Sequence, residues 1–303
     1  MTAVDVAIGV DVGGTKIAAG LVRLHDGAVL ERLQRPTAAA RGGAAVLDDA
    51  FDMARQLWHV AERTAQPPTA IGVALCELVD PTQRPTSGHA VDWRALAARE
   101  RFATLAPTTL EADVRAHAIA EARFGAGQGH GSFAFISIGT GISSTVMIDG
   151  MPWRGARGNA LVLASSPHPQ WCGRCGAHEA VVLEDVAAGP AILARYRAAG
   201  GSAADTAEIL ARIGHDPRAA TVVGEAAAAL GSAIGWLVDV IDPAAVVLGG
   251  GLGSVAGVYH DWLCQAIRAA IYADDTRHLP IERARCGADA GVIGAALAAG
   301  GRR

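Results

Sequence analysis

The sequence predicts an α/β fold built from two similar halves. Strand-turn-strand hairpins alternate with helices along the chain, which is typical of α/β proteins. The segments that begin at Gly9 and at Ser137 are both strand-glycine-turn-strand units, and one lies near the start of each half. A length of 303 residues, of which 51% are apolar, suits about two domains with packed cores.

Charge and composition exclude several classes of protein. The 26 basic and 30 acidic residues give a net charge of −4, which does not favour a nucleic-acid partner. No apolar run reaches about 18 residues without a polar interruption, so we expect no membrane span. The N-terminal residues lack the basic and apolar regions of a signal peptide, and Cys76, Cys264 and Cys286 are expected to be reduced thiols. Cytoplasm is the expected location.

Hydrophobic periodicity and chain breakers place the individual elements. Strands are expected over residues 5–11, 16–23, 70–75, 108–111, 132–138, 144–148 and 244–248. Helices are expected over residues 43–65, 114–124, 181–199, 218–240 and 288–299. A polar loop covers 81–93, and the glycine-rich stretch 125–131 is a candidate hinge between two lobes.

The first glycine turn is a candidate phosphate site. The strand that ends in Asp11 breaks at Gly13, Gly14, Thr15 and Lys16 before the next strand begins. Glycines leave no Cβ in the way, so backbone N–H groups and a hydroxyl can approach a phosphate, and Asp11 can hold Mg²⁺ directly or through water. An ordinary Gly-Gly hairpin is the alternative.

Two further glycine clusters strengthen the phosphate interpretation. Gly139, Thr140 and Gly141 form a second turn of the same kind, and the strand over 244–248 ends in Gly249, Gly250 and Gly251. Two facing turns could hold a polyphosphate, and the third cluster would let a nucleoside approach the backbone. Two unrelated hairpins are the alternative.

Taken together, these motifs resemble the ROK family (repressors, open reading frames, kinases) of the actin-like ATPase superfamily. The resemblance covers nearly the whole chain. It rests on Asp-Val-Gly-Gly-Thr-Lys from Asp11, Glu-Ala-Asp from Glu111, Ile-Gly-Thr-Gly from Ile138, Asp-Gly-Met-Pro-Trp-Arg-Gly-Ala from Asp149, Ala-Gly-Pro-Ala-Ile from Ala188, Asp-Pro-Ala-Ala-Val-Val-Leu-Gly-Gly-Gly from Asp242, and Ala-Asp-Ala-Gly-Val-Ile-Gly-Ala-Ala from Ala288.

The resemblance implies two actin-like (ribonuclease H-like) lobes with a cleft between them. The N-terminal lobe, 1–124, would carry the sugar and the catalytic Asp and be completed by a C-terminal helix over 288–303. The lobe over 125–287 would carry the nucleotide. The implied activity is transfer of the γ-phosphate of ATP, with Mg²⁺, to a hexose 6-hydroxyl, and family kinases are often dimers, so we expect a homodimer.

Asp113 stands where the family's catalytic Asp stands, at the end of a strand and the start of a helix. It would orient the sugar hydroxyl and take its proton. A helix N-cap is the alternative role, and both can hold together. The family's repressors carry an N-terminal helix-turn-helix segment for which this sequence leaves no room, so a repressor is not expected.

The sugar side departs from the glucokinase pattern. The family's sugar-contacting Asn reads Ala112, its loop Asn reads His89 with Trp93 kept, and its Gly-Glu-x-Gly-His motif reads Leu-Val-Leu-Ala-Ser over 161–165. Each lost hydrogen bond to a charged partner costs about 1.5–3 kcal/mol. Because the catalytic Asp and the nucleotide turns remain, we expect an active kinase for a different sugar.

Glu77 suggests which sugar that is. It adds a carboxylate beside the expected pocket, where it would contact a substrate ammonium, so we expect an aminohexose, specifically kanosamine, with His89 as a second sugar contact. A solvated loop carboxylate is the alternative for Glu77. A kinase of glucose or another neutral hexose, and a non-catalytic sugar or nucleotide sensor, are the alternative functions.

A possible zinc loop lies in the second half. His168, Cys172, Cys175 and His178 provide ligand types that suit tetrahedral Zn²⁺, and many relatives carry a structural zinc in this region. The family's later Cys positions are Val or Ala here. A metal-free loop with two thiols is therefore the alternative.

Overall fold

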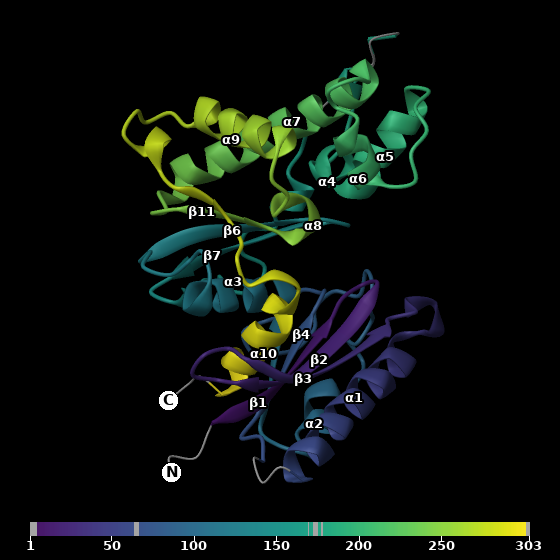
Figure 1. Cartoon of the computed structure of the whole chain (residues 1–303), viewed down its shortest axis with the longest axis vertical. Helices are drawn as coiled ribbons and strands as arrows, with labels where there is room; N and C mark the ends of the chain where they lie inside the picture. Colours follow the sequence, from purple (N-terminus) through teal and green to yellow (C-terminus); the bar gives the residue numbers. More distant parts are fainter. Residues whose placement is uncertain (1–4, 64–66, 169, 172–174, 177, 301–303) are drawn as a thin grey trace. The chain divides into compact units, whose positions relative to one another are not determined.

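The structure, a computed structural model, describes residues 5–63, 67–168, 170–171, 175–176 and 178–300 (Figure 1). The chain forms two compact units. Unit 1 comprises residues 1–129, 147–160 and 285–303, and unit 2 comprises 130–146 and 161–284. Two five-stranded sheets, together with helices, confirm the predicted α/β class.

Unit 1 is built on a mixed sheet with strand order β3-β2-β1-β4-β5. β1 pairs with β2 antiparallel and with β4 parallel, and β4 pairs with β5 parallel. Its elements are β1 (Val6–Val12), β2 (Lys16–Arg23), β3 (Val29–Pro36), η1 (Ala39–Arg41), α1 (Gly43–Arg63), β4 (Ile71–Leu75), α2 (Ala98–Phe102), β5 (Thr108–Ala112), α3 (Asp113–Phe124), η4 (Gly287–Asp289) and α10 (Ala290–Gly300).

Glycines let α10 lie almost on the backbone of this sheet. Gly9 and Gly72 are paired neighbours on β1 and β4, and a Cβ on either would come within 3 Å of the α10 backbone. Gly294 of α10 lies equally close to Ala116 of α3. The C-terminal helix is therefore an integral part of unit 1 and packs against β1, β4 and α3 (Figure 1).

The second sheet has strand order β12-β11-β6-β7-β8, and β11 runs parallel to β6. In unit 2 the long helices α7 and α9 pack against each other (Figure 1). The remaining elements are β6 (Ser132–Ile138), β7 (Ile142–Ile148), β8 (Met151–Pro152), η2 (Leu163–Ser165), β9 (Gln170–Trp171), β10 (His178–Glu179), α4 (Glu184–Ala187), α5 (Gly189–Ala198), α6 (Thr206–Ala211), α7 (Pro217–Ile241), β11 (Val246–Gly249), α8 (Gly250–Gly253), α9 (Val258–Ala270), η3 (Thr276–His278) and β12 (Ile281–Arg283).

Several elements differ from the sequence prediction. The helix expected over 181–199 is two helices, α4 and α5, because Pro190 in the first turn of α5 has no N–H to continue α4. β3 was not predicted, since it is a charged, mostly exposed strand paired only with β2. α9 was also missed, although Tyr259, Leu263 and Ile267 follow helical spacing and are buried.

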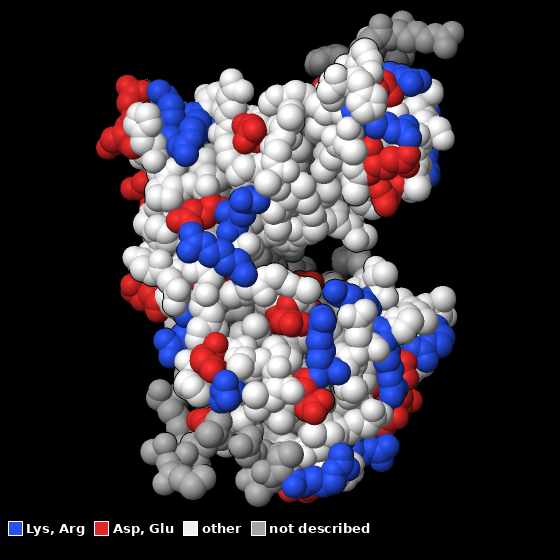
Figure 2. Space-filling model, viewed as in Figure 1, with Lys and Arg blue, Asp and Glu red and all other residues white. Residues whose placement is uncertain are grey.

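Among the residues that the structure describes, one helix, α7, is long and apolar enough to cross a bilayer by length and composition alone. However, 61% of its most apolar window is buried within the protein, as expected of a core helix. Figure 2 shows acidic and basic side chains interspersed on the visible face of each unit.

Candidate active site

The candidate active site of unit 1 begins with two carboxylates at the ends of two parallel strands, β1 and β5. Asp11 lies near the end of β1, and Asp113 follows β5 directly as the first residue of α3. β4 lies between these two strands, and parallel strands end at the same edge of a sheet. The two charges are close enough for Asp11 to raise the pKa of Asp113.

Burial gives Asp113 the proton affinity that a general base requires. Loss of solvent raises its pKa to about 6, with a further increase from Asp11 and an opposing effect from His117. The Asp113 carboxylate also accepts a 2.6 Å hydrogen bond from the backbone N–H of Val114. Near neutral pH this carboxylate is ionised, yet it is basic enough to accept a proton from a bound hydroxyl.

His117 belongs to the same cluster and was missed by the sequence analysis. It lies one helical turn after Asp113 on α3, and its Nδ1 is 2.7 Å from the Asp113 carbonyl oxygen. A carbonyl only accepts, so Nδ1 carries the proton of this hydrogen bond. The imidazole acts to lower the pKa of both Asp11 and Asp113. The i, i+4 spacing from Asp113 was the available signal.

The first glycine turn is anchored to the neighbouring segment. The Thr37 hydroxyl donates to the Gly13 carbonyl at 2.6 Å, and the Thr37 N–H donates to the Thr15 carbonyl at 2.9 Å. Gly14, Thr15 and Lys16 are exposed. Burial raises the pKa of Asp11, and the nearby Lys16 acts to lower it. Thus the backbone and the hydroxyl of this turn are available to a ligand.

In unit 2 the other two glycine clusters come together. They follow β6 and β11, which are neighbouring parallel strands. A Cβ on Gly139 would stand 3.6 Å from the Gly251 N, and one on Gly251 would meet nothing within 4 Å. The Gly189 N–H at the start of α5 donates to the Gly139 carbonyl at 2.8 Å. This glycine-lined space, with the exposed Thr140 hydroxyl beside it, fits the close approach of a nucleotide.

The Glu77 carboxylate accepts hydrogen bonds from residues of its own loop. Its Oε1 accepts from the N–H groups of Ala90 at 2.6 Å and Val91 at 2.9 Å, and its Oε2 accepts from the Ser87 hydroxyl at 2.5 Å. Burial acts to raise the Glu77 pKa, but these hydrogen bonds outweigh it and the pKa is lowered. The side chain, 5% exposed, therefore stays ionised and holds the loop that carries the exposed His89.

Three carboxylates lie close enough to Cys76 to act on its thiol. Burial raises the pKa of this thiol, and the charges of Asp113, Glu77 and Asp11 raise it further. Three carboxylates thus act on one side chain at the end of β4. A group of carboxylates of this kind can attract a cation.

A buried ion pair supports the start of α3. Arg115 and Glu111, which flank Asp113 by two residues on each side, are 4% and 1% exposed. The Arg115 Nε donates to Glu111 Oε1 at 2.5 Å, and Arg154 pairs with Glu111 Oε2. In the sequence, Glu111 was recognised only as part of a motif, and Arg115 was not predicted.

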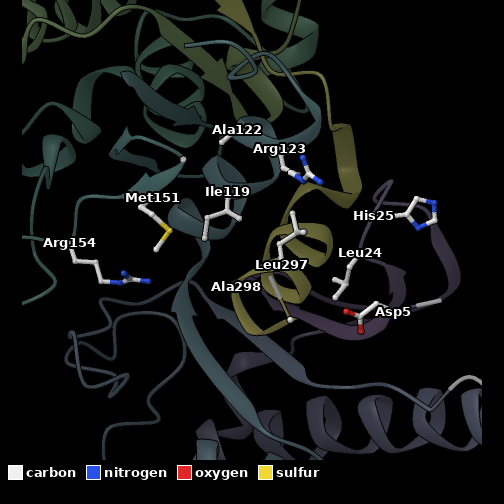
Figure 3. A pocket seen from close by; sticks show the side chains of 12 residues that line it. Asp5, Leu24, His25, Ile119, Ala122, Arg123, Met151, Arg154, Leu297 and Ala298 are labelled. Atoms are coloured by element: carbon white, nitrogen blue, oxygen red, sulfur yellow. The ribbon is translucent and has the colours of Figure 1, made fainter. Parts of the chain in front are cut away.

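A separate cavity of about 480 Å³ lies within unit 1 (Figure 3). Residues of α3, α10 and β8 line it, together with residues that flank β1 and β2. They include Ile119, Leu297, Met151 and Leu24. Neither Asp11 nor Asp113 reaches it. This cavity is therefore distinct from the candidate active site around Asp11 and Asp113.

The predicted zinc loop falls largely outside the described residues. Cys172 lies outside them, and of His178 only the short strand β10 is described. Cys175 is exposed, and the His168 N–H donates to the Val181 carbonyl at 2.9 Å. Within the described ranges, no group of three His, Cys, Asp or Glu residues is placed to hold a metal. Zinc stays a prediction.

The chain is similar to known proteins along nearly its whole length. The model of the ROK family matches residues 7–301. A ROK hexokinase from Thermus thermophilus is 33% identical, with a TM-score of 0.77 and 97% of each chain covered. A ROK glucokinase from Streptomyces griseus, solved with glucose and AMPPNP, is 27% identical, with a TM-score of 0.81 and 97% and 99% coverage. Kanosamine kinase of Amycolatopsis mediterranei is 26% identical, over 97% of this chain and 95% of its own.

Proposed function

The chain belongs to the ROK family and is an ATP-dependent sugar kinase, and we propose that it phosphorylates the 6-hydroxyl of an aminohexose, with kanosamine (3-amino-3-deoxyglucose) as the specific candidate. The observation that carries the aminohexose is the cluster of Asp11, Glu77 and Asp113 around the end of β4. A neutral hexose gains little from such a cluster, whereas an ammonium sugar gains Coulomb attraction.

In the proposed reaction Asp113 is the general base. Its carboxylate orients the sugar 6-hydroxyl and takes the proton as the hydroxyl oxygen attacks the γ-phosphorus. A new O–P bond forms, the bond between the γ-phosphorus and the bridging oxygen breaks, and ADP leaves. The raised pKa of Asp113 suits this proton transfer near neutral pH.

We assign the phosphates of ATP to two sets of backbone groups. In unit 1 these are the exposed Gly14, Thr15 and Lys16, with Gly13 held by Thr37. In unit 2 they are Gly139, Thr140 and Gly141, with Gly249, Gly250 and Gly251 beside the adenosine. Mg²⁺ bound with ATP would offset the phosphate charge, and Asp11 is the carboxylate placed to hold it.

Glu77 supports the aminohexose through its fixed charge. Three of its acceptor positions are used by Ser87, Ala90 and Val91, and a carboxylate offers about four. We propose that Glu77 acts on the substrate through its potential and its remaining acceptor position, while it also places His89. A kinase of glucose is the second candidate, favoured by the glucose complex of the Streptomyces griseus relative.

Release of ADP with Mg-ATP tests this proposal. Glucose, mannose, glucosamine, N-acetylmannosamine and kanosamine would be compared on the wild type, Glu77→Ala and Asp113→Asn. We expect kcat/KM for kanosamine to exceed that for glucose, and Glu77→Ala to narrow this ratio. A preference for glucose would overturn the proposal of an aminohexose substrate, while the kinase activity would stand. ATP and sugar binding without any turnover would favour the sensor.

A further inference from the structure

We propose that Arg115 is a positioning residue that sets sugar specificity, because it ties two loops to the helix that begins with Asp113. The loops are 76–93, which carries Glu77 and His89, and 151–160, which leads into the altered 161–165 motif. This inference rests on the sugar-kinase function proposed above and names the residue that organises the same site.

The Arg115 guanidinium reaches three separate segments. Its Nη2 donates to the Val79 carbonyl at 2.6 Å, its Nη1 to the Gly158 carbonyl at 2.9 Å, and its Nε to Glu111 Oε1 at 2.5 Å. Val79 and Gly158 lie 36 and 43 positions away in the sequence. With Arg115 only 4% exposed, these contacts are formed largely away from water.

Only the planar fork of an arginine satisfies all three acceptors at once. A lysine ammonium is a single charged point on a flexible stem, so it cannot reproduce this geometry. Arg154 pairs with the other oxygen of Glu111, so that carboxylate keeps one partner if Arg115 is lost. The two loop carbonyls would lose the guanidinium that binds them in the protein interior, which is unfavourable.

The two loops also touch each other next to this guanidinium. Gly158 has a φ of +81°, and a Cβ added to it would stand 2.7 Å from the Asp80 Cα. Val79 is bridged across its own loop to Pro85. The two loops are therefore closely packed where Gly158 meets Val79 and Asp80, and we call this contact the loop joint. Arg115 donates a hydrogen bond to each of the two loops there.

The consequence for catalysis follows from the position of Arg115 on α3. It lies two residues after Asp113, so the first turn of α3 carries both the proposed base and the guanidinium that binds the two loops. Movement of either loop changes where the sugar hydroxyls are held relative to the Asp113 carboxylate. The ATP contacts that we assign to the glycine turns do not depend on the loop joint. Loss of Arg115 should therefore weaken sugar binding and leave ATP binding nearly unchanged.

Arg115→Met and Arg115→Lys test the proposal, with Arg123→Met as the matched control. Arg123 is on the same helix but its guanidinium lies over the Phe124 ring. For Arg115→Met we expect the sugar KM and the calorimetric sugar Kd to rise at least tenfold, with the ATP KM within twofold. Discrimination between the best sugar and its epimers should fall at least fivefold. Arg115→Lys should be intermediate, and Arg123→Met should match the wild type.

Gly158→Ala provides a second test with Arg115 intact. The added Cβ pushes the loops apart, so it should reproduce the selective loss of sugar affinity. Folded Arg115→Met or Arg115→Lys protein with unchanged sugar affinity and selectivity would overturn the proposal. Equal losses for sugar and ATP would also overturn it, since they indicate a general structural role. If the wild type turned over no sugar, the kinase function would fail, while the calorimetric comparison would still decide the role of Arg115.

Discussion

Gly291 in the first turn of α10 lies directly against the carboxylate of Asp11, with no space between them for a side chain. A Cβ added to Gly291 would stand less than 3 Å from the Asp11 Cγ, closer than such atoms approach in proteins. The C-terminal helix therefore fixes the side chain of an active-site carboxylate near the end of β1. This contact could not be predicted from the residues next to Asp11 or Gly291 in the sequence.

Gly291→Ala should displace the Asp11 carboxylate. We expect kcat to fall at least tenfold, because we assign that carboxylate to the Mg²⁺ that accompanies the phosphates. We also expect the protein to lose about 1–3 kcal/mol of stability from overpacking. Steady-state kinetics and urea unfolding measure the two effects. Gly131→Ala is the control, since a Cβ there meets nothing within 4 Å. Wild-type kinetics in Gly291→Ala would show that Asp11 needs no fixed position.

Glu121→Gln should destabilise unit 1 where the chain leaves and re-enters it. The buried Glu121 carboxylate accepts from the N–H groups of Ala126 at 2.7 Å, Cys286 at 2.7 Å and Arg285 at 2.9 Å. A Gln amide turns one acceptor into a donor facing these N–H groups, which costs about 2–4 kcal/mol. Thermal and urea unfolding would measure the loss, with Glu62→Gln, at an exposed position of α1, as the control. Equal stability of the two variants would contradict the assignment.

The fold class and most elements could be predicted because they depend on local pattern. Short runs of mostly apolar residues marked β1, β2, β4 and β6, and the glycine turns marked the expected nucleotide side. The break between α4 and α5 was missed, although Pro190 carries the signal for it. The network of Arg115 could not be predicted, because its partners Val79 and Gly158 are distant in the sequence and contribute only backbone oxygens.

The role of Glu77 shows the same limit. Its charge is visible in the sequence, and so is its place after a buried strand. Its hydrogen bonds to Ser87, Ala90 and Val91 depend on how the 76–93 loop folds back on itself. A residue type thus indicates what chemistry is available, whereas loop geometry decides how many of its acceptor positions are already used.

Asp113→Asn should make the protein more stable at pH 8 and inactive. Burial raises the folded pKa of Asp113 from the ordinary 3.8 to about 6, so the folded state binds this proton more tightly than the unfolded state. Ionisation above pH 6 therefore destabilises the fold, by about 1–3 kcal/mol for a shift of about two pKa units. The favourable contribution is fully present below about pH 4 and is lost as the pH rises through 6.

Urea unfolding of the wild type and Asp113→Asn at pH 8 and pH 4 would measure this difference. We expect the variant to be the more stable protein at pH 8 and the two to converge at pH 4. A wild type that is as stable as the variant at pH 8 would mean that Asp113 is not held in a desolvated site.

The role of Asp113 is tested most directly by the pH dependence of kcat/KM for the best sugar, measured from pH 5 to pH 9 at saturating Mg-ATP and compared with Asp113→Asn. We expect kcat/KM to fall as the pH drops through about 6, where Asp113 gains its proton. We expect the variant to lose about 10²–10⁴-fold in kcat/KM while ATP still binds. An Asp113→Asn enzyme within tenfold of the wild type, or an acid limb that persists in the variant, would contradict the assignment of Asp113 as the base.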